Sequence, residues 1–278
     1  MEQTATNPDM IGRSPANDVS IQGKAPQSVF IAAQSLGGVL RNSMALYRAN
    51  FRPLLLAYVL PTFPFTIAQQ VGQVTKNDGL FLVATFVLLI VSISTAGAMT
   101  TMIADICLHN TPSVRRSYGK LLRGGLWLRL LLTTVWQILV VLLGSLLLVV
   151  PGIILSVRLF FTPSVVVLER LSGNAALKRS LNLSKGHFWR LWGDMIVLSI
   201  VFVFAPLLLL TLLSGALGFA LAAYGAPRNA LLVATLPLGF AQLLIYPLLF
   251  IGIVLLYYDL RVRKEAYDVA ALSEDMMR

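Results

Sequence analysis

Six long apolar runs constrain the fold of this sequence more than any other feature. The hydrocarbon core of a bilayer takes about 20 helical residues to cross, and five of the runs reach that length, while the fourth is shorter. The runs are Pro53–Gly72, Leu80–Leu108, Trp127–Val150, Ile153–Leu168, Leu191–Leu213 and Leu231–Tyr258. Only 12% of the residues are charged, about half the share found in soluble domains, which excludes an ordinary soluble protein. We therefore predict an all-α integral membrane bundle of six transmembrane helices.

The basic residues predict the orientation of this bundle. They gather before the first run, between the second and third, between the fourth and fifth, and after the sixth. The opposite side holds only Lys76 and Arg228. Because cytoplasmic loops carry an excess of Lys and Arg, we expect both termini in the cytoplasm and a location in the inner (cytoplasmic) membrane.

Little of the sequence lies outside the predicted bundle. Residues 1–27 are polar and lack both a basic start and an apolar run, so we expect a disordered cytosolic tail and not a cleaved leader. Residues 28–269 form the predicted membrane domain, with a short cytosolic tail at 270–278. The formal net charge of +10 is assigned to contact with anionic lipid headgroups. Nucleic acid is disfavoured as a partner, because the basic residues border apolar runs and do not form one solvated patch.

Three basic segments with similar sequences precede the first, third and fifth runs. Each places cations and a serine before an aromatic anchor: Arg41-Asn42-Ser43, Arg115-Arg116-Ser117 and Lys178-Arg179-Ser180. Interfacial helices combine cations for the headgroups with aromatic rings at the membrane boundary. Two interpretations stay open. Either three hairpin units repeat around a pseudo-axis along the membrane normal, or membrane boundaries simply share this composition.

Small residues and a Pro-Gly pair predict local packing. Pro151 and Gly152 separate the third run from the fourth and predict the reversal there, because proline cannot continue a helix and glycine permits a sharp turn. Four small residues recur at every fourth position of the second run and predict a seam where helix backbones approach closely: Ser92, Ala96, Thr100 and Ala104.

Arg158 interrupts the fourth run. An arginine near the bilayer centre costs about 2.5–3.5 kcal/mol on insertion scales, so two interpretations stay open. It faces a central cavity, or its long stem carries the guanidinium to the nearer surface with the help of a kink around Pro163. Gln137 and Gln242, inside the third and sixth runs, either bond across helices or line a cavity.

Three carboxylates, Asp105, Asp194 and Asp259, lie near the predicted cytoplasmic ends of the second, fifth and sixth runs. At this depth we expect them to pair with the abundant Arg and Lys residues, closing a ring of charge beneath the bundle. A proton or cation pathway would need a second acidic layer deeper in the membrane, and the sequence has none.

Chemical signatures are missing from the sequence. The two histidines, His109 and His187, could share helix faces with Asp105 and Asp194, but without a His-Glu-x-x-His motif or a cysteine cluster we predict no metal site and no cofactor. Cys107 is the only cysteine and is interpreted as an apolar packing residue. No phosphate-binding loop, nucleophile elbow or dinucleotide fingerprint is present.

Three segments resemble the membrane domain of glycerophosphoryl diester phosphodiesterases. They are RLFFTPSVVVLER (158–170), AALKRSLNLSKGHFWRLWGD (175–194) and YYDLRVRKEAYDV (257–269). The similarity covers most of the chain from about Ser28 onward. It implies a helical multi-pass domain that in some relatives precedes a soluble phosphodiesterase barrel. Because the sequence runs only to Arg278, we expect no barrel, and the phosphodiesterase activity is not carried over.

These observations favour a non-catalytic membrane module. The expected ligand is an anionic membrane phospholipid or a partner membrane protein, bound through six cations: Arg115, Arg116, Lys178, Arg179, Lys185 and Arg190. The second hypothesis is a transporter or permease for a lipid or small anion that uses Arg158. The third is an intramembrane enzyme of lipid headgroups, which would require titratable groups gathered around a pocket.

Overall fold

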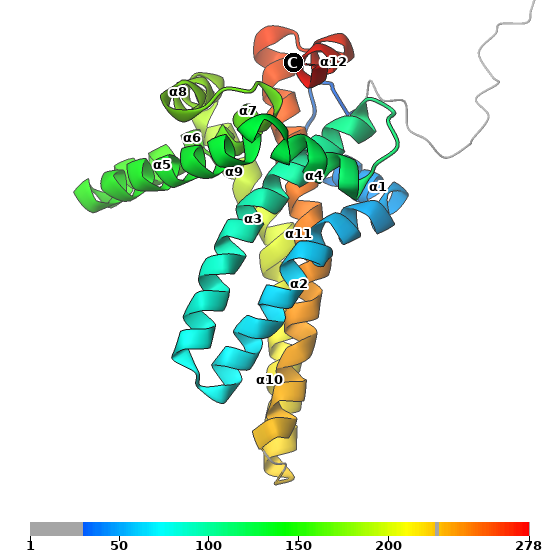
Figure 1. Ribbon diagram of the computed structural model, residues 1–278, viewed down its shortest axis with the longest axis vertical. Helices are drawn as coiled ribbons and strands as arrows, with labels where there is room; N and C mark the ends of the chain where they lie inside the picture. The colour runs from blue at the N-terminus through cyan, green and yellow to red at the C-terminus, as the bar shows by residue number, and fades with distance from the viewer. Residues whose placement is uncertain (1–29, 226–227, 278) are drawn as a thin grey trace, which may run out of the picture.

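The computed structural model describes residues 30–225 and 228–277, including their side chains except at position 74 and at 228–240. The elements of this part of the chain are all helices (Figure 1). They are α1 (Leu36–Ala49), α2 (Phe51–Thr75), α3 (Asp78–Cys107), α4 (Val114–Leu122), η3 (Arg123–Gly125), α5 (Leu126–Leu147), α6 (Val149–Arg158), α7 (Thr162–Leu168), α8 (Gly173–Ser184), α9 (Phe188–Ser199), η4 (Ile200–Phe204), α10 (Ala205–Ala223), α11 (Arg228–Glu265) and α12 (Val269–Met277).

The predicted all-α bundle of six spans is confirmed. Within the described residues, six helical stretches are long and apolar enough to cross a membrane: Phe51–Gln73, Asp78–Cys107, Val114–Leu147, Val149–Leu168, Phe188–Ala223 and Ala241–Glu265. The third and fifth stretches are longer than predicted, because α4 leads into α5 through η3 and α9 leads into α10 through η4. Helix α3 starts at Asp78, two residues before the predicted run, because the Asn77 side chain accepts a hydrogen bond from the Leu80 N–H at 3.0 Å, as an N-cap residue does.

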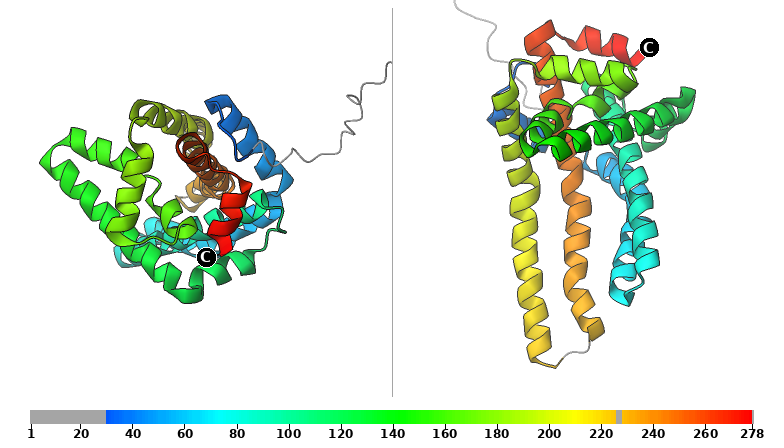
Figure 2. Two further views of the ribbon diagram at one scale, coloured as in Figure 1. Left: turned by 90° about the horizontal axis from the view of Figure 1, so that it is seen from above. Right: turned by 90° about the vertical axis from the view of Figure 1, so that its left-hand side faces the viewer.

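The α5–α6 hairpin does not share the direction of the other hairpins. Figures 1 and 2 show α2, α3, α10 and α11 running along the long axis of the molecule, while α5 and α6 lie across it. The chain changes direction between α4 and α5 at Gly124 and Gly125, whose φ angles are 66° and 70°. Glycine adopts this left-handed conformation without steric cost. The Trp136 Nε1 then fixes α5 to α8 by donating to Asn174 Oδ1 at 2.8 Å.

The crossing hairpin decides the question of an internal repeat. Each of the three units does begin with a short basic helix, α1, α4 or α8, followed by a hairpin of longer helices. A pseudo-axis along the membrane normal requires the three hairpins to point the same way, and the second does not (Figure 1). The units therefore share a helix order but not the expected threefold arrangement.

The reversal between α5 and α6 comes earlier than predicted. The chain turns at Leu148, whose backbone is extended (φ −159°, ψ 142°), and Pro151 and Gly152 lie inside the first turn of α6. The prediction that these two residues make the reversal is wrong, because proline is tolerated in a first helical turn, where its missing N–H would have no helical partner. Gly152 instead lets the helices approach, since a Cβ there would lie 2.6 Å from the Cα of Ser145.

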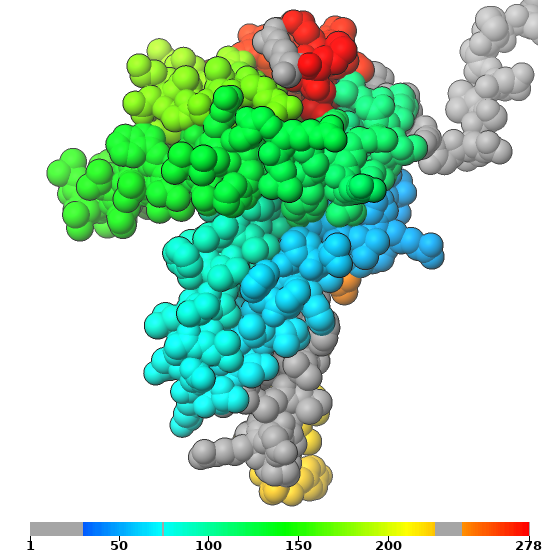
Figure 3. Space-filling view, viewed as in Figure 1, coloured from blue at the N-terminus to red at the C-terminus, as the bar shows by residue number. Residues whose placement is uncertain are grey.

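The buried core lies at one end of the molecule, which we call the basic end: the end that holds α1, α4, α8 and α12. Met99, Met102 and Ile103 of α3 are fully buried there, together with Phe161 and Tyr257. Helix α10, in contrast, has no buried residue. Figure 3 shows the basic end as a broad layer of α4, α5, α8 and α12 above the narrower α2–α3 hairpin.

Two tails were predicted, one at each end of the chain. The predicted tail at residues 1–27 lies outside the described residues. The predicted C-terminal tail includes most of α12, which packs on the bundle: Leu272 is fully buried, and Asp275 Oδ2 accepts a hydrogen bond from Arg261 Nη1 at 2.6 Å.

Candidate functional site

Arg158 lies at the basic end and lines none of the cavities described below. The fourth run is two helices and not one kinked helix, because α6 ends at Arg158 and α7 begins at Thr162 with Pro163 in its first turn. The half-buried Arg158 side chain donates from Nη2 to the Leu181 carbonyl of α8 at 3.3 Å. Among the described residues it has no carboxylate partner. Of the two interpretations of Arg158, the one with a central cavity has no support among the described cavities, because the guanidinium is held against α8.

The two intramembrane glutamines have different environments. Gln242 of α11 lines a cavity between α2, α3 and α11, which is one of the two interpretations given above. Gln137 of α5 does not line this cavity, and its Oε1 is buried without a hydrogen-bond partner among the described residues.

Asp259 is the most deeply buried of the three predicted carboxylates, with an exposed fraction of 0%. It accepts hydrogen bonds from Arg190 Nη2 at 2.7 Å and from Arg263 Nε at 2.9 Å. The backbone N–H of Gln34 donates to it at 2.6 Å. Asp194 lies beside this group, 3.5 Å from Arg190 Nε. The contacts join the start of the described chain to α9 and α11.

Asp105 forms a separate pair on the neighbouring side of the basic end. Its carboxylate is 2.9 Å from the Lys120 Nζ of α4, and its side chain is almost fully buried. The three carboxylates thus pair with cations, but in two places and not in one continuous ring.

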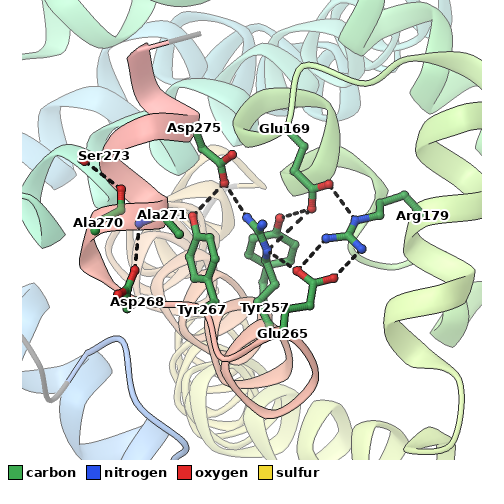
Figure 4. Close-up of polar contacts among 11 residues, drawn as sticks. Glu169, Arg179, Tyr257, Glu265, Tyr267, Asp268, Ala270, Ala271, Ser273 and Asp275 are labelled. Carbon is green, nitrogen blue, oxygen red and sulfur yellow. Dashed lines mark hydrogen bonds and ion pairs between the residues drawn. The ribbon is translucent and has the colours of Figure 1, made fainter.

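A larger set of charges, which we call the central network, consists of Glu169, Arg179, Arg261, Glu265 and Asp275. Figure 4 shows these contacts. Arg179 of α8 donates to Glu169 at 2.7 Å and to Glu265 at 2.8 Å. Arg261 of α11 donates to Glu265 at 3.1 Å and to Asp275 of α12 at 2.6 Å. The network therefore connects the end of α7 with α8, α11 and α12.

Two tyrosines complete the central network. The Tyr257 hydroxyl donates to Glu169 Oε1 at 2.7 Å, and the Tyr267 hydroxyl donates to Asp275 Oδ2 at 2.9 Å (Figure 4). The Arg261 guanidinium carbon also lies 3.7 Å from the centre of the Tyr267 ring, a cation–π distance. Burial raises the pKa of Tyr267, so its hydroxyl stays protonated and can donate.

Of the residues in the central network, only Arg179 was predicted from the sequence as a functional residue. Glu169, Arg261, Glu265 and Tyr267 all belong to the three segments that carried the family resemblance, and this was the available signal. A second signal was the four-residue spacing of Arg261 and Glu265, which places both on one helix face. Asp275 lies outside those segments, and its partner is on another helix.

The six predicted binding cations divide into two groups. Arg190 pairs with the buried Asp259, and Arg179 pairs with the partly buried Glu169 and with Glu265; both arginines are half-buried. The hydrogen bond to Glu265, together with Glu169, raises the pKa of Arg179, so its charge is permanent at any physiological pH. The other four cations are exposed and have no ion pair among the described residues: Arg115, Arg116, Lys178 and Lys185.

An apolar groove involves the start of α9, which follows one of these cations, Lys185, in the sequence. It has a volume of about 260 Å³ and lies between the start of α6 and α9, lined by Val150, Ile153, Ile154, Phe188, Trp189 and Trp192. The Phe188 and Trp189 rings are in edge contact at 5.3 Å, and Trp189 is 74% exposed. Lys185 precedes Phe188 by three residues. Its carbonyl and that of Asn182 each accept a hydrogen bond from Lys264 Nζ at 2.6 Å, which fixes the α8–α9 turn.

The remaining candidates for chemistry show no gathering of ligands. Within residues 30–225 and 228–277, no group of three or more His, Cys, Asp or Glu side chains is placed to hold a metal ion. His109 and His187 lie in the turns before α4 and α9, and Cys107 is buried in the core.

The helices and their polar contacts define a multi-pass α-helical membrane domain. The family model of the membrane domain of glycerophosphoryl diester phosphodiesterase matches residues 127–270. This is just over half of the 278 residues, and the chain belongs to that family. The match includes every residue of the central network except Asp275, and no catalytic domain family was found. Neither a curated protein nor a solved structure matches the chain.

Proposed function

We propose that the protein is a membrane module without catalytic activity of its own, which binds anionic phospholipid at its basic end. One observation carries the proposal: the exposed Lys185 precedes by three residues in the sequence the first of the aromatic residues Phe188, Trp189 and Trp192, which wall an apolar groove. A phospholipid needs a cation for its phosphate and an apolar surface for its acyl chains. Tryptophan is the residue enriched at the boundary between the two.

The wider charge distribution supports the same proposal. If the basic end faces the cytoplasm, as the excess of Lys and Arg predicts, its exposed cations meet the anionic leaflet. Each cation near such a surface contributes about 1 kcal/mol. Arg179 and Arg190 do not belong to this binding surface, because Arg190 pairs with the buried Asp259 and Arg179 with the partly buried Glu169. The proposed surface therefore contains four of the six predicted cations: Arg115, Arg116, Lys178 and Lys185.

The transporter hypothesis built on Arg158 has less support. It requires Arg158 to meet a substrate in a central cavity, whereas the side chain contacts α8 at the basic end. The hypothesis of an intramembrane enzyme has less support too, because the lining of the described cavities contains no Asp, Glu, His, Lys or Arg.

The test is lipid retention in native mass spectrometry of the purified full chain in nanodiscs of mixed phosphatidylglycerol and phosphatidylcholine. The double variant Lys178→Gln/Lys185→Gln should weaken phosphatidylglycerol binding about 30-fold at low salt, since two contributions of about 1 kcal/mol are lost. Phosphatidylcholine retention should not change.

The matched control is Arg41→Gln/Arg48→Gln, which removes the same charge from exposed positions of α1. If both pairs weaken phosphatidylglycerol binding equally, the attraction is general and the groove is not a site. If neither pair altered phosphatidylglycerol retention, the proposal would be contradicted. A partner protein would then be the alternative ligand of these cations.

A further inference from the structure

A second and chemically different cavity lies within the membrane-spanning helices. It has a volume of about 400 Å³, and its described lining comes from α2, α3 and α11. Nine of the thirteen lining residues have polar side chains, among them Tyr58, Thr62, Gln70, Thr85, Gln242 and Tyr246. They belong to the stretches Phe51–Gln73, Asp78–Cys107 and Ala241–Glu265, which are long and apolar enough to cross a membrane. Each polar group in hydrocarbon is costly unless it finds a partner, so nine polar side chains around one cavity call for a reason.

Part of this polarity is satisfied by the helices themselves. The Thr62 hydroxyl donates to the Tyr58 carbonyl at 2.6 Å, and the Thr85 hydroxyl donates to the Phe81 carbonyl at 2.7 Å. Gln69 Nε2 in turn donates to Thr85 Oγ1 at 2.9 Å. These hydroxyl oxygens keep acceptor capacity toward the cavity.

Four other lining groups have no such partner. The side-chain amides of Gln70 and Gln242 and the hydroxyls of Tyr58 and Tyr246 make no hydrogen bond to any described residue. Each can both donate and accept. The rings of Tyr58 and Tyr246 stack at 5.9 Å and form one apolar wall. In a water-poor environment such groups require a partner that also donates and accepts, and a hydroxyl group does so.

The cavity has no charge among its described lining residues. A phosphate or ammonium group placed there would lose its hydration without gaining a counter-ion, which is strongly unfavourable. The ligand expected in this cavity is therefore uncharged. The ligand proposed for the basic end, where the cations are exposed, is anionic.

A smaller cavity adjoins this one. It has a volume of about 190 Å³ and shares Ser92 and Phe250 with the larger cavity, while its other lining residues are Ile93, Ala96, Thr134 and Pro163. The small-residue seam predicted on α3 explains the opening, because Thr100 and Ala104 are buried by packing, whereas Ser92 and Ala96 line the cavity. A cavity that contains several polar groups, beside one that is almost wholly apolar, suits a molecule that has a polar and an apolar part.

We propose that the cavity between α2, α3 and α11 binds an uncharged, hydroxyl-rich group, such as the sugar headgroup of a neutral glycolipid. The hydroxyls pair with Gln70, Gln242 and the two tyrosines, and the apolar part extends past Phe250. A soluble sugar has the same hydroxyl chemistry and is the other source of such a group.

The experiment uses the full chain in phosphatidylcholine nanodiscs, with monogalactosyldiacylglycerol added and retention measured by native mass spectrometry. The wild type should retain the galactolipid over phosphatidylglycerol. Gln242→Leu and the nearly isosteric Tyr246→Phe should each weaken retention about five- to tenfold, the effect of one lost hydrogen bond. Gln137→Leu is the matched control, because this intramembrane glutamine lies outside the cavity.

Each result has a defined meaning. Displacement of the galactolipid by millimolar methyl galactoside would support the site and assign it to a soluble sugar, and resistance to displacement would assign it to the lipid. No preferential retention by the wild type, or an equal loss in Gln242→Leu and Gln137→Leu, would overturn the proposal. Lys178→Gln/Lys185→Gln should leave galactolipid retention unchanged, so this proposal and that for the basic end can fail separately.

Discussion

Helix α3 passes through two regions of the molecule that are built differently. From Thr95 to Cys107 nearly every residue is buried, whereas before Thr95 only Ala84 is. The buried half belongs to the basic end, which also contains the described ion pairs. The exposed half belongs to the α2–α3 hairpin, which we call the distal part together with α10. In a bilayer apolar side chains need not be buried in protein, so the distal part can be stable in lipid without a core.

The largest effect is expected from a substitution that breaks the central network at the basic end. Arg261→Met removes the partner of Asp275, and both side chains are only 10% exposed. We expect the free energy of unfolding to fall by about 3–5 kcal/mol, because a buried carboxylate is left without its cation. Denaturation in mixed micelles followed by circular dichroism measures the change. Arg261→Met/Asp275→Asn should recover part of the loss, and a loss below about 1 kcal/mol would mean that water reaches the network.

The second prediction compares the stability losses caused by substitutions in the two halves of α3. Met102 is fully buried, while Leu82 is 64% exposed. Met102→Ala should cost about 2–5 kcal/mol because it leaves a cavity in the core, whereas Leu82→Ala should change stability by less than about 0.5 kcal/mol. The same denaturation measurement applies to both. Equal losses would show that the distal part is also held by protein packing, for example in an oligomer.

A smaller loss than at Met102 is expected at Tyr47, which attaches α1 to α11 through a hydrogen bond to the Leu244 carbonyl at 2.8 Å. Tyr47→Phe should cost about 0.5–1.5 kcal/mol. Burial raises the pKa of Tyr47 from 10.0 to about 12, so the neutral form is favoured in the folded protein. The contribution is complete below pH 10 and is lost as the pH rises through 12. The stability difference between the two proteins should decline over this range, and a constant difference would contradict the assignment.

The number of spans could be predicted from sequence because it depends on composition, which is local. The direction of the α5–α6 hairpin could not. It follows from two consecutive left-handed glycines and from the contact of Trp136 with Asn174, and an apolar run contains no information about either. The misplaced reversal at Pro151 has a similar cause, because proline both ends helices and begins them.

The pairing of the charged residues also depends on contacts that are distant in the sequence. Lys178 and Arg179 are adjacent in sequence, yet the first is exposed and the second holds Glu169 and Glu265. Which of the two is available to a ligand depends on a carboxylate 86 positions later in the chain. The pairing of Asp105, Asp194 and Asp259 with cations could be expected from composition alone, but the identity of each partner could not.

The contact between Gln34 and Asp259 has a consequence for biosynthesis. The two residues are 225 positions apart, and Tyr47 meets Leu244 across 197 positions. A ribosome therefore releases α1 long before its partner strip on α11 exists. The contacts that join α1 to α11 can form only after the last long helix has been synthesised. The basic end is therefore completed only when translation is nearly finished.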